Sequence, residues 1–109
     1  MTDPADIDGA SGTIWWLYMI ECRGGGIYTG IAIDVDLRYE KHASGRGARY
    51  TRINPPVRLL CRHPFSDRQS AARAEYVIKR LSSERKWAMA TSGSFGEAVA
   101  ATMARRQSR

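Results

Sequence analysis

Two apolar, β-prone segments joined by a glycine-rich turn are the feature that most constrains how this chain can fold. Residues 14–22 are almost wholly apolar and aromatic, which is typical of a strand covered on both faces. Residues 27–33 form a second segment of this kind. The glycines between them, residues 24–26, allow the chain to reverse with positive φ. The sequence therefore predicts a β-hairpin.

Alternation along the predicted strands places two tyrosines where they can meet. Side chains two residues apart share one face of a strand, so Tyr18 lies on the face of its even-numbered neighbours, and Tyr28 shares a face with Gly30. If the register aligns these faces, the two phenols converge over a backbone that Gly30 leaves bare. The alternative for either tyrosine alone is ordinary core packing.

A helix is predicted directly after the hairpin, over residues 35–43. Asp34 is suited to cap its N-terminus and Gly45 to end it. Arg38 and His42 are four residues apart, so they lie on one side of this helix. Taken singly, each is as well explained as a solvated helix residue.

The next segment, residues 46–56, is basic and rich in turn residues, and a strand is predicted after it, over residues 57–65. Its arginines alternate with an aromatic residue: Arg46, Arg49, Tyr50 and Arg52. This mixture suits a nucleic-acid backbone with one base stacked on the ring. The alternative is a solvated loop.

A longer amphipathic helix is predicted to run to Leu81, with Ser66 and Gln69 forming a capping box at its start. Its buried stripe consists of alanines and larger aliphatic residues: Ala71, Ala74, Val77, Ile78 and Leu81. Glu75 falls beside this stripe, where a half-buried carboxylate needs a cation. Lys79, one turn later, is one candidate, and Mg²⁺ is the other.

The remainder of the chain indicates a single domain. Residues 1–12 are expected to be a disordered leader and residues 13–91 the domain itself. A short helix is predicted over residues 84–90. Ser94 with Glu97 is a possible cap for a last helix in a basic tail, residues 92–109, which we expect to pack loosely.

Charge and composition favour a polyanion as partner and exclude a membrane span. The formal net charge is +6, and setting aside the three aspartates of the leader leaves about +9 on the rest. No apolar segment approaches the roughly 20 residues that cross a bilayer. Cys22 and Cys61 lack metal-ligand spacing and fit apolar strands as small hydrophobic residues. We expect a cytoplasmic protein.

The residues singled out above form one ordered series: Tyr18, Tyr28, Gly30, Arg38, His42 and Glu75. In this series the chain resembles the GIY-YIG nuclease family, and in particular its small single-domain members, over residues 14–89. The string Gly26-Ile27-Tyr28 is misleading, because the first motif corresponds to residues 16–18 and the second to residues 28–30. The resemblance implies an α/β (α+β) fold with a small three-stranded, mostly antiparallel sheet flanked by helices.

The resemblance also implies a chemistry. The family hydrolyses phosphodiester bonds with one divalent ion, Mg²⁺ or Mn²⁺, which it would hold at Glu75. Arg38 would neutralise charge on the phosphoryl oxygens, and Tyr18 or Tyr28 would accept the proton of the attacking water. Since a phenol has a pKa of about 10, this role requires Arg38 and the metal to lower it. His42 would orient this water or deprotonate it.

The expected function is therefore a metal-dependent endonuclease, with DNA favoured as substrate in repair or processing. The rival is a catalytically weak or inactive module that binds nucleic acid, or a partner protein, through the same fold. Two departures support the rival: the first motif keeps its tyrosine without its glycine, and no asparagine after Glu75 matches the one found late in many members. Arg46, Arg49, Tyr50, Arg52 and Lys79 are the predicted nucleic-acid contacts under both readings.

Overall fold

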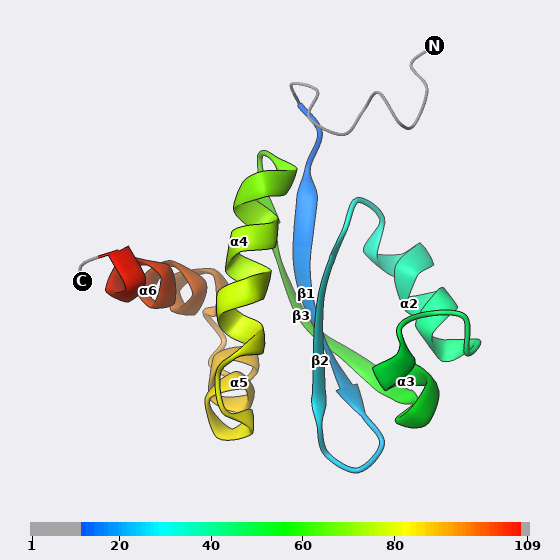
Figure 1. The fold of residues 1–109 in the computed structure, drawn as a ribbon. Helices are drawn as coiled ribbons and strands as arrows, with labels where there is room; N and C mark the ends of the chain where they lie inside the picture. The colour runs from blue at the N-terminus through cyan, green and yellow to red at the C-terminus, as the bar shows by residue number, and fades with distance from the viewer. Residues whose placement is uncertain (1–11, 108–109) are drawn as a thin grey trace.

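The computed structural model describes residues 12–107, so the predicted leader lies, apart from Gly12, outside the described residues. Three strands, β1 (Trp15–Cys22), β2 (Ile27–Ala32) and β3 (Pro56–Phe65), form an antiparallel sheet in the order β2-β1-β3. Helices flank this sheet (Figure 1). The fold predicted from the sequence is confirmed.

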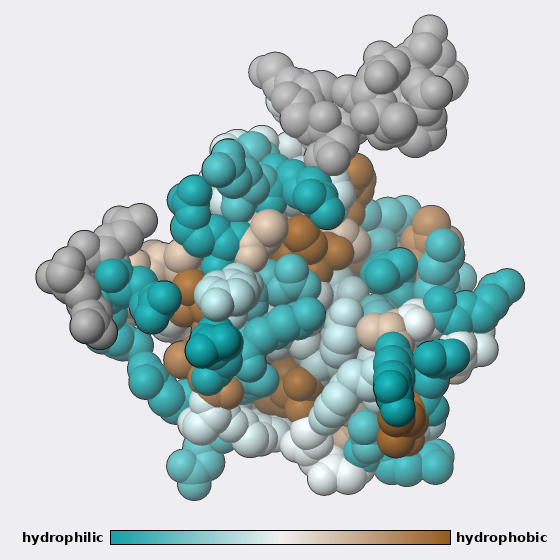
Figure 2. All heavy atoms as spheres, viewed as in Figure 1, coloured by the Kyte–Doolittle hydropathy of each residue, from teal (hydrophilic) through white to brown (hydrophobic). Residues whose placement is uncertain are grey.

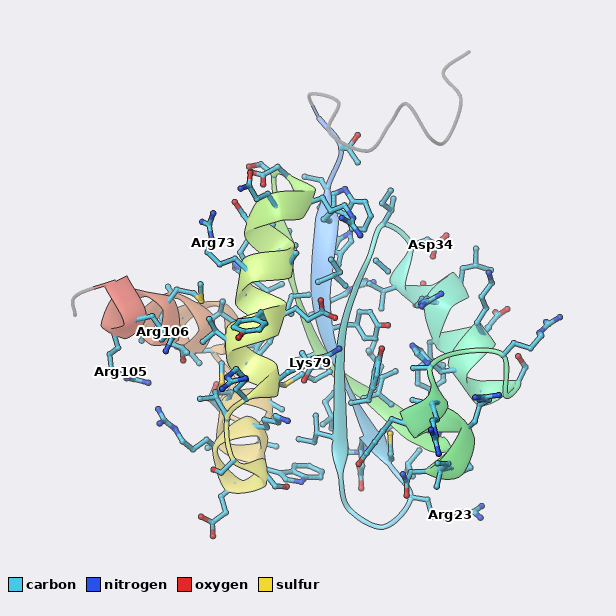
Figure 3. The ribbon with its side chains drawn as sticks, viewed as in Figure 1. Arg23, Asp34, Arg73, Lys79, Arg105 and Arg106 are labelled. Atoms are coloured by element: carbon cyan, nitrogen blue, oxygen red, sulfur yellow. The ribbon has the colours of Figure 1, made fainter. Side chains whose placement is uncertain are left out.

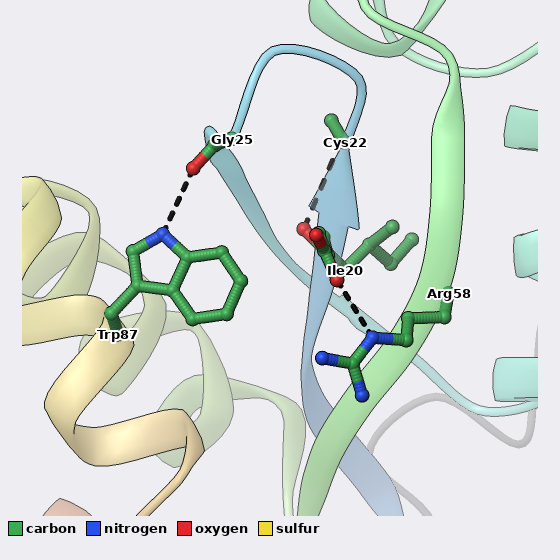
Figure 4. A network of polar contacts seen from close by, with 6 residues as sticks. Ile20, Cys22, Gly25, Arg58 and Trp87 are labelled. Atoms are coloured by element: carbon green, nitrogen blue, oxygen red, sulfur yellow. Dashed lines mark hydrogen bonds and ion pairs between the residues drawn. The ribbon is translucent and has the colours of Figure 1, made fainter.

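The hairpin between β1 and β2 sets the register on which the site depends. Tyr18 pairs directly with Gly30 across the two strands. The turn contains two glycines with positive φ, Gly24 and Gly25, a conformation that other residues rarely adopt. The indole Nε1 of Trp87 donates a hydrogen bond of 2.9 Å to the carbonyl of Gly25 (Figure 4), so the turn is anchored to the helical layer.

Helices cover both faces of the sheet. The first layer contains α2 (Val35–Ala43) and α3 (Arg49–Ile53), and the second contains α4 (Arg68–Lys79), α5 (Ser83–Ala90) and α6 (Phe95–Gln107), as Figure 1 shows. Alternate residues of β1 supply the two cores. Leu17 and Met19 pack with the second layer, whereas Tyr18, Ile20 and Cys22 pack on the opposite face near Val35.

Side-chain caps begin α2 and α4, the helices that carry Arg38, His42 and Glu75. Asp34 caps α2 as predicted, since its carboxylate accepts a hydrogen bond of 3.0 Å from the backbone N–H of Leu37. The predicted cap of α4 was wrong. Asp67, not Ser66, is the N-cap, and its carboxylate accepts both the backbone N–H and the hydroxyl of Ser70, at 2.7 and 3.1 Å. A carboxylate takes both hydrogen bonds at once, which a hydroxyl does less well.

Two segments differ from their predicted structure. Residues 49–53, expected to lie in a loop, form the short helix α3, which is too brief to show a helical periodicity in sequence. The last helix predicted in the tail is present as α6, but it does not pack loosely: its Phe95 and Val99 are 8% and 2% exposed within the main core. The sequence contained few large apolar residues there, but those few point inward.

Hydrophilic residues cover most of the face shown in Figure 2, and hydrophobic residues appear there as small separate patches. Among residues 12–107, no helix has both the length and the apolar character needed to cross a membrane.

Phe95→Ala tests whether α6 belongs to the core. We expect the free energy of unfolding to fall by about 3 kcal/mol, since a buried aromatic ring leaves a cavity behind. The matched control is Tyr76→Ala on α4, because Tyr76 is 59% exposed and its loss should cost less than about 1 kcal/mol. Urea unfolding monitored by circular dichroism measures both values. Equal, small losses would mean that α6 packs loosely.

Candidate active site

Three rings meet on the face of the sheet that α2 and α3 cover. The ring centroids of Tyr28 and His42 are 4.7 Å apart, and that of Tyr18 lies 6.3 Å from Tyr28 and 6.1 Å from His42. The two tyrosines, predicted to converge, therefore do so. Tyr18 is buried with 1% exposure, whereas Tyr28 is only half-buried, so solvent reaches one phenol and not the other.

Gly30 is the residue that allows this convergence. A Cβ at position 30 would lie 2.6 Å from the Tyr18 hydroxyl oxygen and 3.0 Å from a ring carbon of Tyr28. Both distances are shorter than van der Waals contact, so any larger side chain would push the phenols apart. The glycine of the second motif is therefore explained by packing against both rings.

His42 is fully buried and hydrogen-bonded through both ring nitrogens. Its Nε2 lies 2.9 Å from the Tyr18 hydroxyl, and its Nδ1 lies 2.8 Å from the Thr51 hydroxyl. Thr51 is also buried, at 1% exposure, and donates to the carbonyl of Ala48 at 2.9 Å. A continuous polar chain thus runs from β1 through α2 to α3 inside the protein.

Arg38 is exposed at the edge of this cluster and influences both buried groups. Burial raises the pKa of the Tyr18 phenol, and the nearby guanidinium of Arg38 opposes this without overcoming it. Burial also lowers the pKa of His42, and the charge of Arg38 lowers it further. Arg38 therefore acts on the Tyr18 pKa in the expected direction, but without a metal ion burial outweighs it. At neutral pH the buried pair consists of a neutral phenol and a neutral imidazole.

Glu75 faces the cluster from α4, and its immediate partner is Lys79. The two form an ion pair of 3.3 Å, with the Glu75 side chain 22% exposed and that of Lys79 46% exposed. Lys79 reaches from α4 toward β2 (Figure 3), where its ammonium lies 5.5 Å from the centroid of the Tyr28 ring. Glu75 is close enough to Tyr18 to contribute to the raised pKa of that phenol.

The predicted nucleic-acid contacts lie beside these rings on and before α3. Arg46, Arg49 and Arg52 are exposed. Tyr50 is 40% exposed, and its ring stacks on that of Tyr28 with centroids 6.2 Å apart and an interplanar angle of 26°. One aromatic stack therefore joins the basic segment to the phenols. Arg58, on β3, forms an ion pair of 2.7 Å with Glu21 (Figure 4).

Sequence reasoning missed Thr51 and Gly47. Thr51 lies within a basic segment whose other side chains are polar or exposed, so nothing in the sequence marked it as buried. A Cβ at Gly47 would collide with His42 Nδ1 and would lie 2.8 Å from the His42 Cα. The sequence offered one signal for Gly47: a glycine shortly after His42 can mark a place where the backbone approaches another group closely.

A metal ion would find one carboxylate here. Within residues 12–107, no group of three or more histidine, cysteine, aspartate or glutamate side chains is arranged to hold a metal. Mg²⁺ commonly uses one or two protein carboxylates and takes its other ligands from water and substrate phosphates. The partly buried carboxylate of Glu75 fits that mode of binding, in which the substrate completes the coordination.

Comparison with known proteins finds one family model and several relatives that match this chain. A family model described as the GIY-YIG catalytic domain matches residues 14–88. The UPF0213 protein of Xanthomonas axonopodis pv. citri is 53% identical over 74 residues, which are 68% of this chain and 72% of that protein. The UPF0213 protein of Cupriavidus necator is 50% identical over 72 residues, 66% of this chain and 78% of that one.

A solved structure is also similar to this chain. It is the solution NMR structure of the UPF0213 protein from Bacillus halodurans, which is 45% identical and superimposes with a TM-score of 0.43 over 67% of this chain and 78% of that chain.

The buried imidazole should make stability depend on pH. Because the pKa of His42 is lowered in the folded protein, the unfolded chain binds more protons below its ordinary pKa of about 6.5. The free energy of unfolding should therefore be full above about pH 7 and decline as the pH falls through about 6.5 toward 5. Chemical denaturation between pH 5 and 8 measures this slope.

His42→Gln should abolish most of this slope, and His63→Gln, at the only other histidine of the chain, should retain it. If the slope survives in His42→Gln and vanishes in His63→Gln, the pH dependence comes from His63 and the prediction is wrong.

Proposed function

The chain belongs to the GIY-YIG family, and from this we propose that it is a metal-dependent endonuclease that hydrolyses phosphodiester bonds in nucleic acid, with DNA as the favoured substrate. The family domain is of a nuclease type. The observation that carries the proposal is the convergence of two phenols and an imidazole beside an exposed arginine and a partly buried carboxylate. These are groups that transfer protons and stabilise a phosphoryl transition state.

Tyr28 is the phenol that we assign to the attacking water. Tyr18 is sealed from solvent and already hydrogen-bonded to His42, whereas Tyr28 is half-buried. A phenol is a weak base at neutral pH, so this role requires positive charge near the ring. The ammonium of Lys79, 5.5 Å from the centroid, supports the assignment.

Tyr18 and His42 act behind Tyr28 as a positioning pair. Neither reaches solvent, since each is 1% exposed. The His42 ring packs against that of Tyr28 at 4.7 Å, and the Tyr18 hydroxyl lies over Gly30, where a Cβ would approach it to 2.6 Å. Together they hold the orientation of the Tyr28 ring, which a catalytic group requires.

Arg38 and Glu75 supply the charges on either side of the rings. Arg38 is exposed next to Tyr18, where its guanidinium can donate two hydrogen bonds to a phosphate. Glu75 would hold Mg²⁺ or Mn²⁺, and a bound ion of this kind polarises the scissile phosphate and stabilises the leaving oxygen. For Glu75 to do this, Lys79 must release its ion pair and turn toward the phosphate.

The binding surface continues over α3. Arg46, Arg49 and Arg52 place positive charge beside Tyr50, whose ring already stacks on Tyr28. Arginines on one small surface favour a phosphate backbone without selecting a sequence. A base stacked on Tyr50 would place the adjoining phosphate beside the phenols.

The second candidate is a module that binds nucleic acid without cleaving it. The ion pair between Glu75 and Lys79 favours it, because Glu75 already has a partner. The two functions share one surface and differ in whether Glu75 exchanges Lys79 for a metal ion.

Binding should depend strongly on salt. Arginine contacts release counterions from the phosphate backbone, so we expect the affinity for DNA to fall steeply between about 50 and 200 mM salt. The triple variant Arg46→Ala, Arg49→Ala, Arg52→Ala should weaken binding equally for all sequences and reduce the salt slope by about 3. Fluorescence anisotropy measures both effects.

The control for this experiment is Arg58→Ala, because Arg58 is occupied by Glu21 and should contribute little. Affinity that is unchanged in the triple variant would exclude this surface as the contact.

Cleavage distinguishes the two candidates. If the protein is an endonuclease, a panel of linear and branched DNA and RNA should be cut only with Mg²⁺ or Mn²⁺, and EDTA should stop the reaction. Glu75→Gln should abolish cleavage and preserve binding, and Arg38→Ala should lower the rate by about 100-fold or more, since it removes charge stabilisation of the transition state. Gel electrophoresis of labelled substrates records both.

Phenylalanine variants separate the tyrosines. Tyr28→Phe should remove activity with little loss of stability. Tyr18→Phe should also lower stability, by about 1–3 kcal/mol, because it leaves a ring nitrogen of His42 without a partner. Lys79→Ala frees Glu75 but removes the ammonium beside Tyr28, so it should lower the rate of metal-dependent cleavage without abolishing it as Glu75→Gln does. Full cleavage by Glu75→Gln would indicate a contaminating nuclease, and no cleavage by wild type with either metal would favour the binding module.

A further inference from the structure

Thr51 occupies a position that the nuclease proposal leaves without a role. It lies on α3, a helix of five residues (Arg49–Ile53) whose N-cap residue, Ala48, makes no side-chain capping hydrogen bond. Its side chain is buried at 1% exposure, while the other residues of α3 are exposed. Its hydroxyl oxygen lies 2.8 Å from His42 Nδ1 and 2.9 Å from the carbonyl oxygen of Ala48.

Counting protons decides how these groups are hydrogen-bonded. A threonine hydroxyl has one proton to donate and two lone pairs that accept. The Ala48 carbonyl can only accept, so the Thr51 proton goes to it. The contact between Thr51 and His42 then needs a proton from the histidine, so Nδ1 carries a hydrogen. In a neutral imidazole the other nitrogen, Nε2, is then an acceptor.

The other end of the ring agrees with this assignment. Nε2 lies 2.9 Å from the Tyr18 hydroxyl, which can donate to it. The lowered pKa of His42 supports a neutral ring with one proton. The opposite tautomer would let the Ala48 N–H donate to Nδ1, but that contact is long, at 3.4 Å. In that tautomer the Thr51 hydroxyl would give its proton to Nδ1. The oxygens of Thr51 and Ala48 would then face each other at 2.9 Å with no proton between them.

We propose that Thr51 is a positioning residue that fixes His42 as the Nδ1-protonated tautomer, so that Nε2 accepts the hydroxyl proton of Tyr18. The hydrogen-bond chain then has one direction: Tyr18 donates to His42, His42 to Thr51, and Thr51 to the backbone of Ala48. The lone pairs of the Tyr18 oxygen stay available on the side that faces Arg38. This assignment stands without the nuclease proposal, and only its consequence for cleavage rests on it.

The backbone before α3 supports the same role. Gly47 lies so close to the imidazole that a Cβ there would collide with Nδ1. The chain between α2 and α3 therefore closes against the ring, and the Thr51 hydroxyl is brought to Nδ1 by the first turn of α3. The exposed side of this helix carries the arginines predicted to bind nucleic acid, so one short element serves both surfaces.

NMR of the imidazole nitrogens tests the proposal directly. Protein with ¹⁵N-labelled histidine has two imidazoles, His42 and His63, and His42→Gln assigns their signals. At pH 7.5 we expect His42 of the wild type to show a protonated Nδ1 and an unprotonated Nε2. Thr51→Ser keeps the hydroxyl and should retain this pattern. Thr51→Val keeps the shape without the hydroxyl and should shift the ring toward the Nε2-protonated form, in which Nδ1 accepts from Ala48.

Thr29→Val is the matched control. Thr29 is buried at 2% exposure on the opposite face of the sheet, and its hydroxyl finds no hydrogen-bond partner within the described part of the chain. Removing that hydroxyl should leave the His42 signals unchanged. An Nε2-protonated His42 in the wild type would overturn the proposal, and so would an unchanged tautomer in a folded Thr51→Val. If Thr51→Val does not fold, the wild-type tautomer and its retention in Thr51→Ser remain decisive.

Cleavage provides a second readout where the wild type is active. Thr51→Val should lower kcat about tenfold, the equivalent of one hydrogen bond, with KM unchanged. Thr51→Ser should restore most of the rate, and Thr29→Val should cleave as wild type does. A shifted tautomer with an undiminished kcat would show that the orientation of His42 does not serve catalysis. If the wild type cleaves no substrate, the nuclease proposal fails while the NMR result still decides the role of Thr51.

Discussion

The buried hydrogen bond between the Tyr18 hydroxyl and His42 Nε2 is the contact on which the rest of the site depends. It joins the central strand of the sheet to α2, and neither group reaches water. A buried polar group that loses its partner costs about 1–3 kcal/mol, so this pair allows few alternatives. Gly30 must stay small beneath the Tyr18 hydroxyl, and Gly47 must stay small against the imidazole. The two partners of this hydrogen bond therefore each require a glycine beside them: Gly30 next to Tyr18 and Gly47 next to His42.

The site has a buried interior and an accessible rim, and the two have different physical characters. Inside, burial raises the pKa of Tyr18 and lowers that of His42, so the pair stays uncharged and its hydrogen bonds keep their directions. At the rim, Arg38, Lys79 and Tyr28 meet solvent. A phosphodiester would contact the rim, while the interior holds the rim in place. This division favours Tyr28 over Tyr18 as the group that meets the attacking water.

The ion pair of Glu75 with Lys79 links the nuclease and binding proposals. Because the Lys79 side chain is 46% exposed, its ammonium can move into solvent, and a divalent ion with a bound phosphate could replace it at Glu75. The displaced ammonium lies above the Tyr28 ring, where it can contact the same phosphate. The sequence suggested two partners for Glu75, a lysine and a metal ion. In the nuclease proposal Glu75 binds first Lys79 and then the metal ion, whereas in the binding module it keeps Lys79.

The sequence by itself determined the hairpin, the cap and stop of α2, and the order of the six candidate residues, because alternation, capping and glycine turns act locally. Tertiary structure decided the rest. The register that pairs Tyr18 with Gly30 depends on packing across two strands, and the burial of Phe95 and Val99 depends on how α6 packs against β3, α4 and α5. Thr51 became part of the site only because a five-residue helix folds back on His42. Nothing in a short basic segment reveals which of its side chains will face inward, since that choice is made by a contact nine residues away.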